Sequence, residues 1–112
     1  MTATLEQQHC TPCREGVAPL DEAAARTFLA DLPDWLLAED AKRISRNFRF
    51  KNFAQALAFV NEVGAIAEAE GHHPDIAFGW GYASISLQTH KIDGLHENDF
   101  ILAAKIDALA RP

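Results

Sequence analysis

Long apolar runs are missing from the sequence, and so is any pattern typical of a secretory leader. No apolar run approaches the ~20 residues that a membrane-spanning helix needs. The N-terminal stretch Met-Thr-Ala-Thr-Leu-Glu-Gln-Gln has neither a basic region nor an apolar core, so it does not resemble a signal peptide. We therefore expect a cytoplasmic protein that does not bind membranes.

Basic residues are scarce relative to acidic ones. Ten lysines and arginines stand against sixteen aspartates and glutamates, which gives a formal net charge of −6. This surplus of negative charge opposes binding to nucleic acid and to anionic membrane surfaces. The sequence also lacks Gly-x-Gly-x-x-Gly and P-loop patterns, which disfavours the nucleotide-binding folds. At 112 residues, 48% of them hydrophobic, the chain is long enough for one domain with a single core.

Cysteine is limited to two residues, both in the stretch His9-Cys10-Thr11-Pro12-Cys13. Cys-x-x-Cys is the spacing of half a zinc site or of a redox pair, but no second Cys-x-x-Cys or His-x-x-x-His follows. The strand and helix that flank redox motifs are absent too. We therefore favour a flexible N-terminal extension over residues 1–20 carrying two reduced thiols, followed by one domain over residues 21–112.

Helical and strand periodicities succeed one another along residues 21–112. The predicted elements are a helix over 21–32, a hairpin of 35–38 and 44–50, a helix from 53 to about 70, a strand pair of 75–81 and 82–90, and a helix over 96–110. Alternating strands are typical of an antiparallel sheet with one covered face. We predict an α+β fold, a two-layer sandwich whose four-stranded antiparallel sheet has the helices packed on one face. Its β-β-α-β-β-α core is preceded by a helix.

Helix ends are marked by capping residues. Asp21 and Asn52 stand where the first and second helices need N-caps. Gly71 suits the left-handed residue that often follows a helix, and Pro74 cannot continue one. The second helix should therefore end immediately before two adjacent histidines.

Three histidines and two carboxylates fall at the ends of these elements: Glu68, His72, His73, His90 and Asp99. Imidazoles exchange protons near neutral pH, so the group predicts an acid/base site. Glu68 and His72 are four residues apart and would share a helix face. Taken singly, His72 would cap the helix and the other histidines would be surface residues. A metal site is less favoured, because adjacent side chains on a regular element diverge.

The spacing of these residues resembles a family signature: Glu68-x-x-x-His72-His73-Pro74, then Trp80, His90 and Asp99. The family is that of the pterin-4a-carbinolamine dehydratases, also called the DCoH-like family. The resemblance covers about residues 21–110, and the segment with the two cysteines is similar to the N-terminal extension of the bacterial branch. It implies the α+β fold and a hydro-lyase that dehydrates 4a-hydroxytetrahydropterin to quinonoid dihydropterin, recycling the cofactor of aromatic amino acid hydroxylases.

The resemblance also implies roles for individual residues. The implied catalytic residues are His72, His73 and His90: His72 and His90 would transfer protons, while His73 would hold the pterin. Glu68 and Asp99 would support the histidines. The implied substrate contacts are Gly71, His72, His73, Gln88, Thr89, His90 and Lys91. No metal and no organic cofactor is implied, because the pterin is the substrate.

Partners are implied as well. The resemblance implies a homo-dimer or homo-tetramer and an aromatic amino acid hydroxylase as partner. The second predicted strand pair also offers an open edge for assembly, with few edge charges between residues 82 and 89. Ile76 departs from the family pattern, since many relatives carry an aromatic residue there, and this would alter the pocket wall. The alternative function is a non-catalytic, coactivator-like assembly module on the same fold. A metal-dependent enzyme ranks last.

Overall fold

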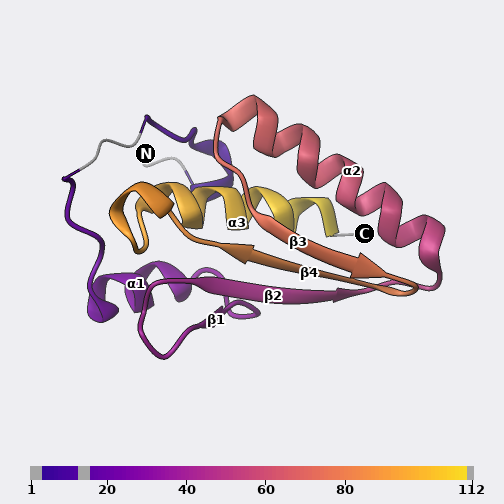
Figure 1. Cartoon of the computed structure of the whole chain (residues 1–112), viewed down its shortest axis with the longest axis horizontal. Helices are drawn as coiled ribbons and strands as arrows, with labels where there is room; N and C mark the ends of the chain where they lie inside the picture. The colour runs from indigo at the N-terminus through magenta and orange to yellow at the C-terminus, as the bar shows by residue number, and fades with distance from the viewer. Residues whose placement is uncertain (1–3, 13–15, 111–112) are drawn as a thin grey trace.

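A four-stranded sheet is covered on one side by helices in the computed structural model of the chain (Figure 1). The structure describes residues 4–12 and 16–110. Its elements are η1 (Leu5–Gln7), α1 (Glu22–Leu29), β1 (Leu36–Leu37), β2 (Ile44–Arg49), α2 (Phe53–Glu70), β3 (Asp75–Gly79), β4 (Tyr82–Leu87), η2 (His90–Ile92) and α3 (Glu97–Ala110). The predicted α+β sandwich is confirmed. Across the described ranges, none of the helices has the length and apolar character needed to span a bilayer.

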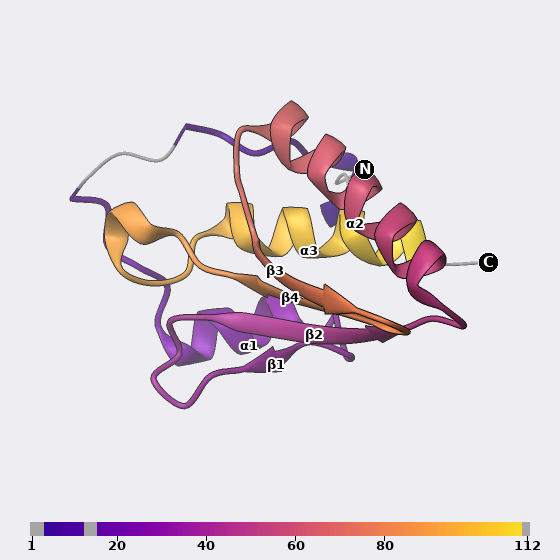
Figure 2. The same ribbon diagram turned by 45° about the vertical axis from the view of Figure 1, so that its right-hand side comes forward.

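The strands run antiparallel in the order β1-β2-β4-β3 (Figure 2). β4 therefore pairs with β2 on one side and with β3 on the other. The second strand pair does supply an edge of the sheet, but that edge is β3; placing it over residues 82–89 is wrong, because β4 lies inside the sheet. Its hydrogen-bonding groups are already engaged on both sides, and the edges of the sheet are β1 and β3.

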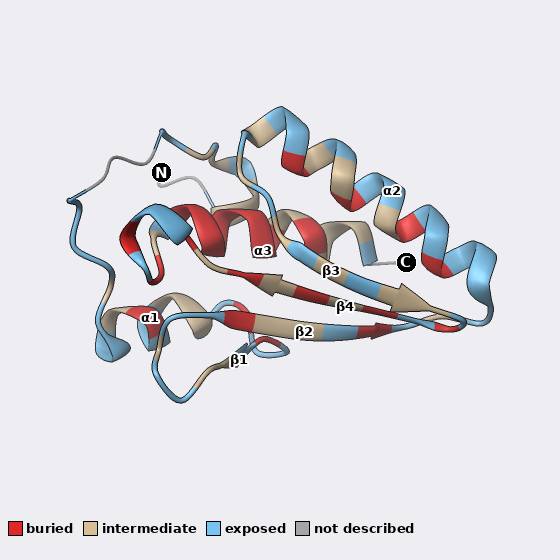
Figure 3. Cartoon of the chain, in the orientation of Figure 1, coloured by how far each residue is buried: buried red, intermediate tan, exposed pale blue. Residues whose placement is uncertain are grey.

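The two faces of the sheet differ in character, as the alternation predicts. Both β2 and β4 carry buried positions in alternation with less buried ones, visible as red bands along these strands (Figure 3). The buried residues are Ile44, Phe48, Ala83, Ile85 and Leu87, which belong to the core cluster. Helix α3 is buried along most of its length, and its Phe100 stacks on Phe28 of α1 with ring centroids 4.9 Å apart. The core thus lies between the sheet and the helices, and α3 is its centre.

Arg46 interrupts the apolar row of β2, and the structure gives it partners. Its guanidinium donates to the Asp107 carboxylate of α3 at 2.7 Å and lies 4.3 Å from the ring centroid of Phe48. The indole N–H of Trp35 donates to the same carboxylate oxygen at 2.8 Å. A charged side chain on this face is therefore paired, and the break in the strand pattern does not break the strand.

Capping fixes where the helices begin and end. The N-caps predicted at Asp21 and Asn52 are confirmed, since each side chain accepts a hydrogen bond from the backbone N–H three residues on, at 2.8 and 2.9 Å. Helix α1 ends at Leu29, earlier than the predicted residue 32. Helix α2 ends at Glu70, where Gly71 has a φ of +66° in the left-handed region that favours glycine. The chain therefore turns sharply before the histidine pair.

The loop between β4 and α3 is closed by a backbone bridge, and it packs against the segment that precedes α1. β4 ends at Leu87, earlier than the predicted residue 90, and an isolated bridge between Thr89 and Gly94 encloses η2. A Cβ added to Gly94 would lie 2.5 Å from the Cβ of Pro19, so glycine permits a close approach there. The loop that carries His90 is thereby packed against the segment preceding α1.

Candidate active site

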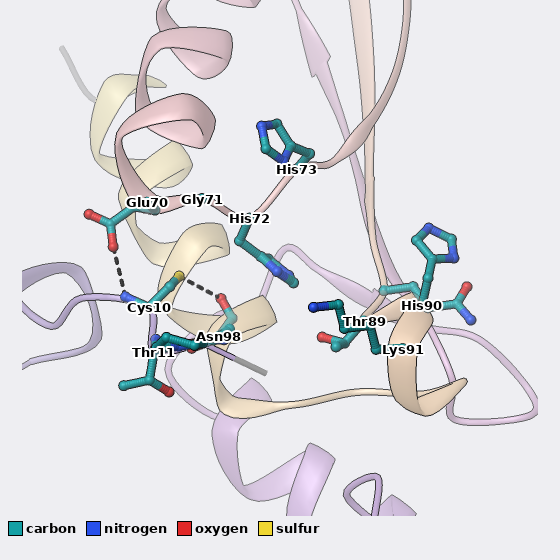
Figure 4. A pocket seen from close by; sticks show the side chains of 12 residues that line it. Cys10, Thr11, Glu70, Gly71, His72, His73, Thr89, His90, Lys91 and Asn98 are labelled. Carbon is teal, nitrogen blue, oxygen red and sulfur yellow. Dashed lines mark hydrogen bonds between the residues drawn. The ribbon is translucent and has the colours of Figure 1, made fainter. Parts of the chain in front are cut away.

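A pocket of about 490 Å³ lies where the end of α2 meets the loop after β4 and the start of α3 (Figure 4). Small-molecule sites in proteins typically have volumes of roughly 300–1,000 Å³. The lining includes every substrate contact implied by the sequence, namely Gly71, His72, His73, Gln88, Thr89, His90 and Lys91. It also includes residues that the sequence does not predict: Cys10, Thr11, Pro12, Glu70 and Asn98. Segments distant in sequence therefore meet at one pocket.

Asp99 is a carboxylate with no exposed surface at the start of α3, and it accepts three hydrogen bonds. Its Oδ1 lies 2.6 Å from Nε2 of His72. Its Oδ2 accepts from the Thr89 hydroxyl at 2.7 Å and from the backbone N–H of His96 at 3.0 Å. Buried charged groups are tolerated when they are satisfied in this way. Because a carboxylate accepts, Nε2 carries the proton, and Asp99 sets both the orientation and the tautomer of His72.

His72 presents its ring from the end of α2 towards the loop that carries Thr89 (Figure 4). Its side chain is 12% exposed, and its Nδ1 has no hydrogen-bond partner among the residues that the structure describes. One ring nitrogen is thus held by a buried carboxylate while the other is available to a ligand. This is the arrangement of a general acid or base.

Glu68 does not pair with His72, so that prediction is wrong. Helix α2 ends at Glu70, and the left-handed Gly71 carries His72 out of the register in which residues four apart are neighbours. The Glu68 carboxylate instead bonds Nε2 of His73. Both side chains are largely exposed, at 79% and 58%, so the pair orients His73 but adds little stability.

His90 comes to the pocket from η2, on a different wall from His72 (Figure 4). It is exposed, and so is the neighbouring Lys91. Gln88 stands just before them, with its amide 3.5 Å from Asp93. The fold therefore brings both expected proton-transfer histidines to one pocket, although a whole strand pair separates them in sequence.

The wall formed by the N-terminal segment is the part of the site that sequence reasoning missed. Burial raises the pKa of the Cys10 thiol to about 12, and the negative charges of Glu70 and Asp99 act in the same direction. The thiol is therefore protonated and neutral at physiological pH. Cys13, the second residue of the Cys-x-x-Cys pair, lies outside the described residues. Within residues 4–12 and 16–110, no three His, Cys, Asp or Glu side chains are grouped as a metal site requires.

Comparison with known proteins identifies the family. Residues 18–109 match the family described as pterin 4 alpha carbinolamine dehydratase. A Cupriavidus pinatubonensis protein is 56% identical over 110 residues, covering 98% of this chain and 95% of its own. A Halorhodospira halophila protein is 58% identical over 106 residues, covering 95% and 97%. Both are provisionally named pterin-4-alpha-carbinolamine dehydratases. The chain belongs to the pterin-4a-carbinolamine dehydratase family.

Two solved structures share the fold. A Brucella melitensis protein described as a transcriptional coactivator/pterin dehydratase superposes with a TM-score of 0.79 at 30% identity, covering 83% of this chain and 99% of its own. A pterin dehydratase-like protein described as a RuBisCO assembly factor in the alpha-carboxysome gives a TM-score of 0.60 at 32% identity, covering 69% and 89%. The fold thus supports both enzymatic and assembly descriptions, and the site must decide between them.

Proposed function

We propose that the protein is a hydro-lyase that dehydrates 4a-hydroxytetrahydropterin to quinonoid dihydropterin and water, recycling the pterin cofactor of aromatic amino acid hydroxylases. The observation that carries this proposal is the pair of His72 and the buried Asp99, in a pocket that His90 also lines. Family membership supplies the substrate class.

The reaction delivers one proton and removes another. The C4a–O bond breaks as the hydroxyl takes up a proton and departs as water. Loss of the proton from the adjacent ring nitrogen leaves an electron pair that forms the C=N bond of the quinonoid product. We assign these two transfers to His72 and His90, each worth typically 10²–10⁴-fold in rate. Neither transfer requires a metal or an organic cofactor.

The remaining pocket residues hold the substrate. We assign His73, oriented by Glu68, to binding the pterin, together with the backbone at Gly71. The hydroxyl of Thr89 donates to Asp99, so towards a ligand it acts as an acceptor. Gln88 and Lys91 complete the contacts.

A non-catalytic assembly module is the second candidate. It is favoured by the solved relative that is described as a RuBisCO assembly factor, and by the coactivator half of the Brucella protein's description. Binding a protein partner does not require two histidines, His72 and His90, to line one small-molecule pocket, with one ring nitrogen of His72 held by Asp99 and the other open to a ligand. This arrangement therefore supports the enzyme over the module.

The test is the rate of 4a-hydroxytetrahydropterin dehydration, followed by ultraviolet absorbance, in wild type, His72→Ala and His90→Ala. We expect fast turnover that falls by about two orders of magnitude or more in each variant. Glu97→Gln, an exposed change at the same end of α3, is the control. If folded wild type does not accelerate the reaction over buffer, the proposed enzymatic function is rejected and the assembly function is favoured instead.

We further propose that the chain forms homo-dimers or homo-tetramers and has an aromatic amino acid hydroxylase as partner. The outer edge of β3 carries a single charged residue, Asp75, so most of that edge is open to pairing with another strand. Sedimentation velocity that detects only monomer at micromolar concentration would contradict the assembly. The cytoplasmic location stays a prediction.

A further inference from the structure

The segment of residues 5–12, here called the N-terminal strap, lies along α3 and passes the end of α2 to reach the pocket (Figures 1 and 4). Its first turn is anchored on the core. Leu5 packs against the buried cluster, and Nζ of Lys105 in α3 donates to the backbone carbonyl of Glu6 at 2.8 Å. The strap is therefore attached to the helical layer before it reaches the site.

Asn98 is the second anchor. Its side chain is almost fully buried, and its amide pairs with the backbone of Thr11 in both directions. The amide oxygen accepts from the Thr11 N–H at 2.9 Å, and the amide nitrogen donates to the Thr11 carbonyl at 2.6 Å. The asparagine amide thus bonds the N–H and C=O of one residue, as a neighbouring β-strand would. Because both bonds involve the Thr11 backbone, they do not depend on the side chain at that position.

Glu70 is the third anchor. Its side chain is 8% exposed, and its carboxylate accepts from the backbone N–H of Cys10 at 2.7 Å and bonds Nδ1 of His9 at 2.9 Å. Burial alone would raise the pKa of Glu70, but the Cys10 N–H, His9 and the charge of Lys105 together hold it below its ordinary value. The carboxylate is therefore ionised at neutral pH, in the form that binds the strap most strongly.

Two of the three anchors, Asn98 and Glu70, are immediate chain neighbours of the proposed catalytic residues. Asn98 precedes Asp99, and Glu70 precedes Gly71 and His72. The strap is nevertheless outside the family match, which begins at residue 18. The Brucella structure is matched over 99% of its own length while 83% of this chain is covered. The strap therefore lies outside the part of the chain that the family model matches, although the Cupriavidus and Halorhodospira relatives align over 98% and 95% of this chain.

We propose that the N-terminal strap is a specificity-determining wall of the pterin pocket: the bound substrate contacts Cys10, Thr11 and Pro12, and docking of the strap on Glu70 and Asn98 sets how tightly the substrate is held. This inference rests on the proposed function. The reacting carbon must lie within reach of His72 and His90, so the strap contacts a part of the substrate that does not react. The neutral thiol, hydroxyl and proline ring suit an uncharged substituent of the pterin ring.

Contacts to a non-reacting part of a substrate stabilise the ground state and the transition state alike, so they act on KM and leave kcat almost unchanged. Thr11→Pro removes the N–H that Asn98 accepts from and should raise KM by roughly tenfold. Thr11→Ala is the matched variant, because it keeps both bonds to Asn98 and reports the side-chain contact alone. Asn98→Leu should raise KM similarly, and the double variant should not exceed the larger single effect, since both changes release the same strap.

A second readout follows strap docking without using turnover. In a Cys13→Ser background, a chromogenic disulfide reagent reports the exposure of the Cys10 thiolate. With the thiol pKa near 12 rather than the ordinary 9.0, its thiolate fraction at pH 8 is lower by up to roughly 10³-fold, and labelling is slow. Thr11→Pro should speed labelling. Biopterin, which has no C4a hydroxyl and cannot react, should slow labelling in wild type, because a ligand that contacts the docked strap stabilises it.

The two experiments separate this inference from the proposed reaction. If biopterin protects Cys10 while wild type catalyses no dehydration, the proposed reaction is wrong, and the proposal that the N-terminal strap forms a pocket wall is supported. If wild type turns over, Thr11→Pro keeps the wild-type KM and biopterin leaves labelling unchanged, the strap wall is overturned and the reaction stands. The absence of both turnover and protection overturns both.

Discussion

Replacing Asp99 with asparagine changes one oxygen of a buried carboxylate to an amide nitrogen at almost constant volume. The carboxylate accepts from His72 through one oxygen and from Thr89 and His96 through the other. An amide keeps only one acceptor, so its nitrogen must face a donor in either orientation. If the amide nitrogen faces His96, it meets a backbone N–H, which can only donate, so no hydrogen bond forms. Facing His72, it forces the ring into the tautomer in which Nε2 accepts and Nδ1 carries the proton.

Both orientations have a calculable consequence. A buried donor left without an acceptor destabilises the fold by about 1–3 kcal/mol. The wrong tautomer removes one of the two proton transfers, which corresponds to a fall of roughly 10²–10⁴ in kcat, or about 2.7–5.4 kcal/mol of transition-state stabilisation. Because the His72 ring can change tautomer whereas a backbone N–H can only donate, we expect the amide nitrogen to face His72. Asp99→Asn should therefore lose far more activity than stability, with the unfolding transition still cooperative.

The assay is steady-state dehydration of 4a-hydroxytetrahydropterin, paired with urea unfolding of the same preparations. Glu97→Gln is the matched control, because it makes the same chemical change in the same helical turn at an exposed position. A folded Asp99→Asn protein whose kcat lies within about threefold of wild type would refute the reasoning. In that case the buried pair would serve the fold and not the proton transfers.

Three further predictions concern the residues around this pair. Thr89→Val removes the hydroxyl bond to Asp99 and should lower kcat at least tenfold, while Thr89→Ser keeps the hydroxyl and should retain most activity; equal rates would contradict a positioning role. Because the folded-state pKa of Glu70 lies below its ordinary value near 4.5, its contribution is full above that pH and is lost as pH falls through the folded-state pKa. The difference in unfolding free energy between wild type and Glu70→Gln, measured in urea, should therefore be largest at neutral pH and shrink below about pH 4.5; a difference that stays flat with pH would contradict it. Gly71→Ala should lower the unfolding free energy by about 1–2 kcal/mol through its left-handed φ, whereas Gly64→Ala, within α2 and equally unobstructed, should raise it by about 0.5–1 kcal/mol; equal shifts would refute the backbone argument.

Local patterns in the sequence were sufficient to predict the secondary-structure elements, and the family resemblance supplied part of the pocket lining but not its N-terminal wall. Alternation over β2 and β4 predicts which side chains are buried, and the stop at Gly71 predicts where the histidines leave the helix. The partner of His72 was not predictable in this way. The rule for residues four apart pointed to Glu68, whereas Asp99, 27 residues away, reaches the ring only through the packing of α3. Strand order is equally non-local, which is why the position of β4 inside the sheet was missed.

The N-terminal strap escaped prediction for a different reason. Its bonds to Asn98 and Glu70 are made mostly by backbone groups of Cys10 and Thr11, which every sequence carries. No apolar periodicity marks such a segment. The two anchors look in sequence like ordinary polar residues at helix ends, and only the tertiary arrangement shows that they face the strap.

Asp99 is also the residue that starts α3. It stands third in the helix and its carboxylate accepts from the N–H of His96, while its own N–H donates to the His96 carbonyl at 3.0 Å. A descendant of such a protein that abandoned dehydration for an assembly role would still be under selection to keep a carboxylate here, because its last helix begins with it. It would be under no such pressure at His90, whose side chain is exposed. Among diverged relatives, loss of the histidine, and not survival of the aspartate, is therefore the signature of an enzyme that has become a scaffold.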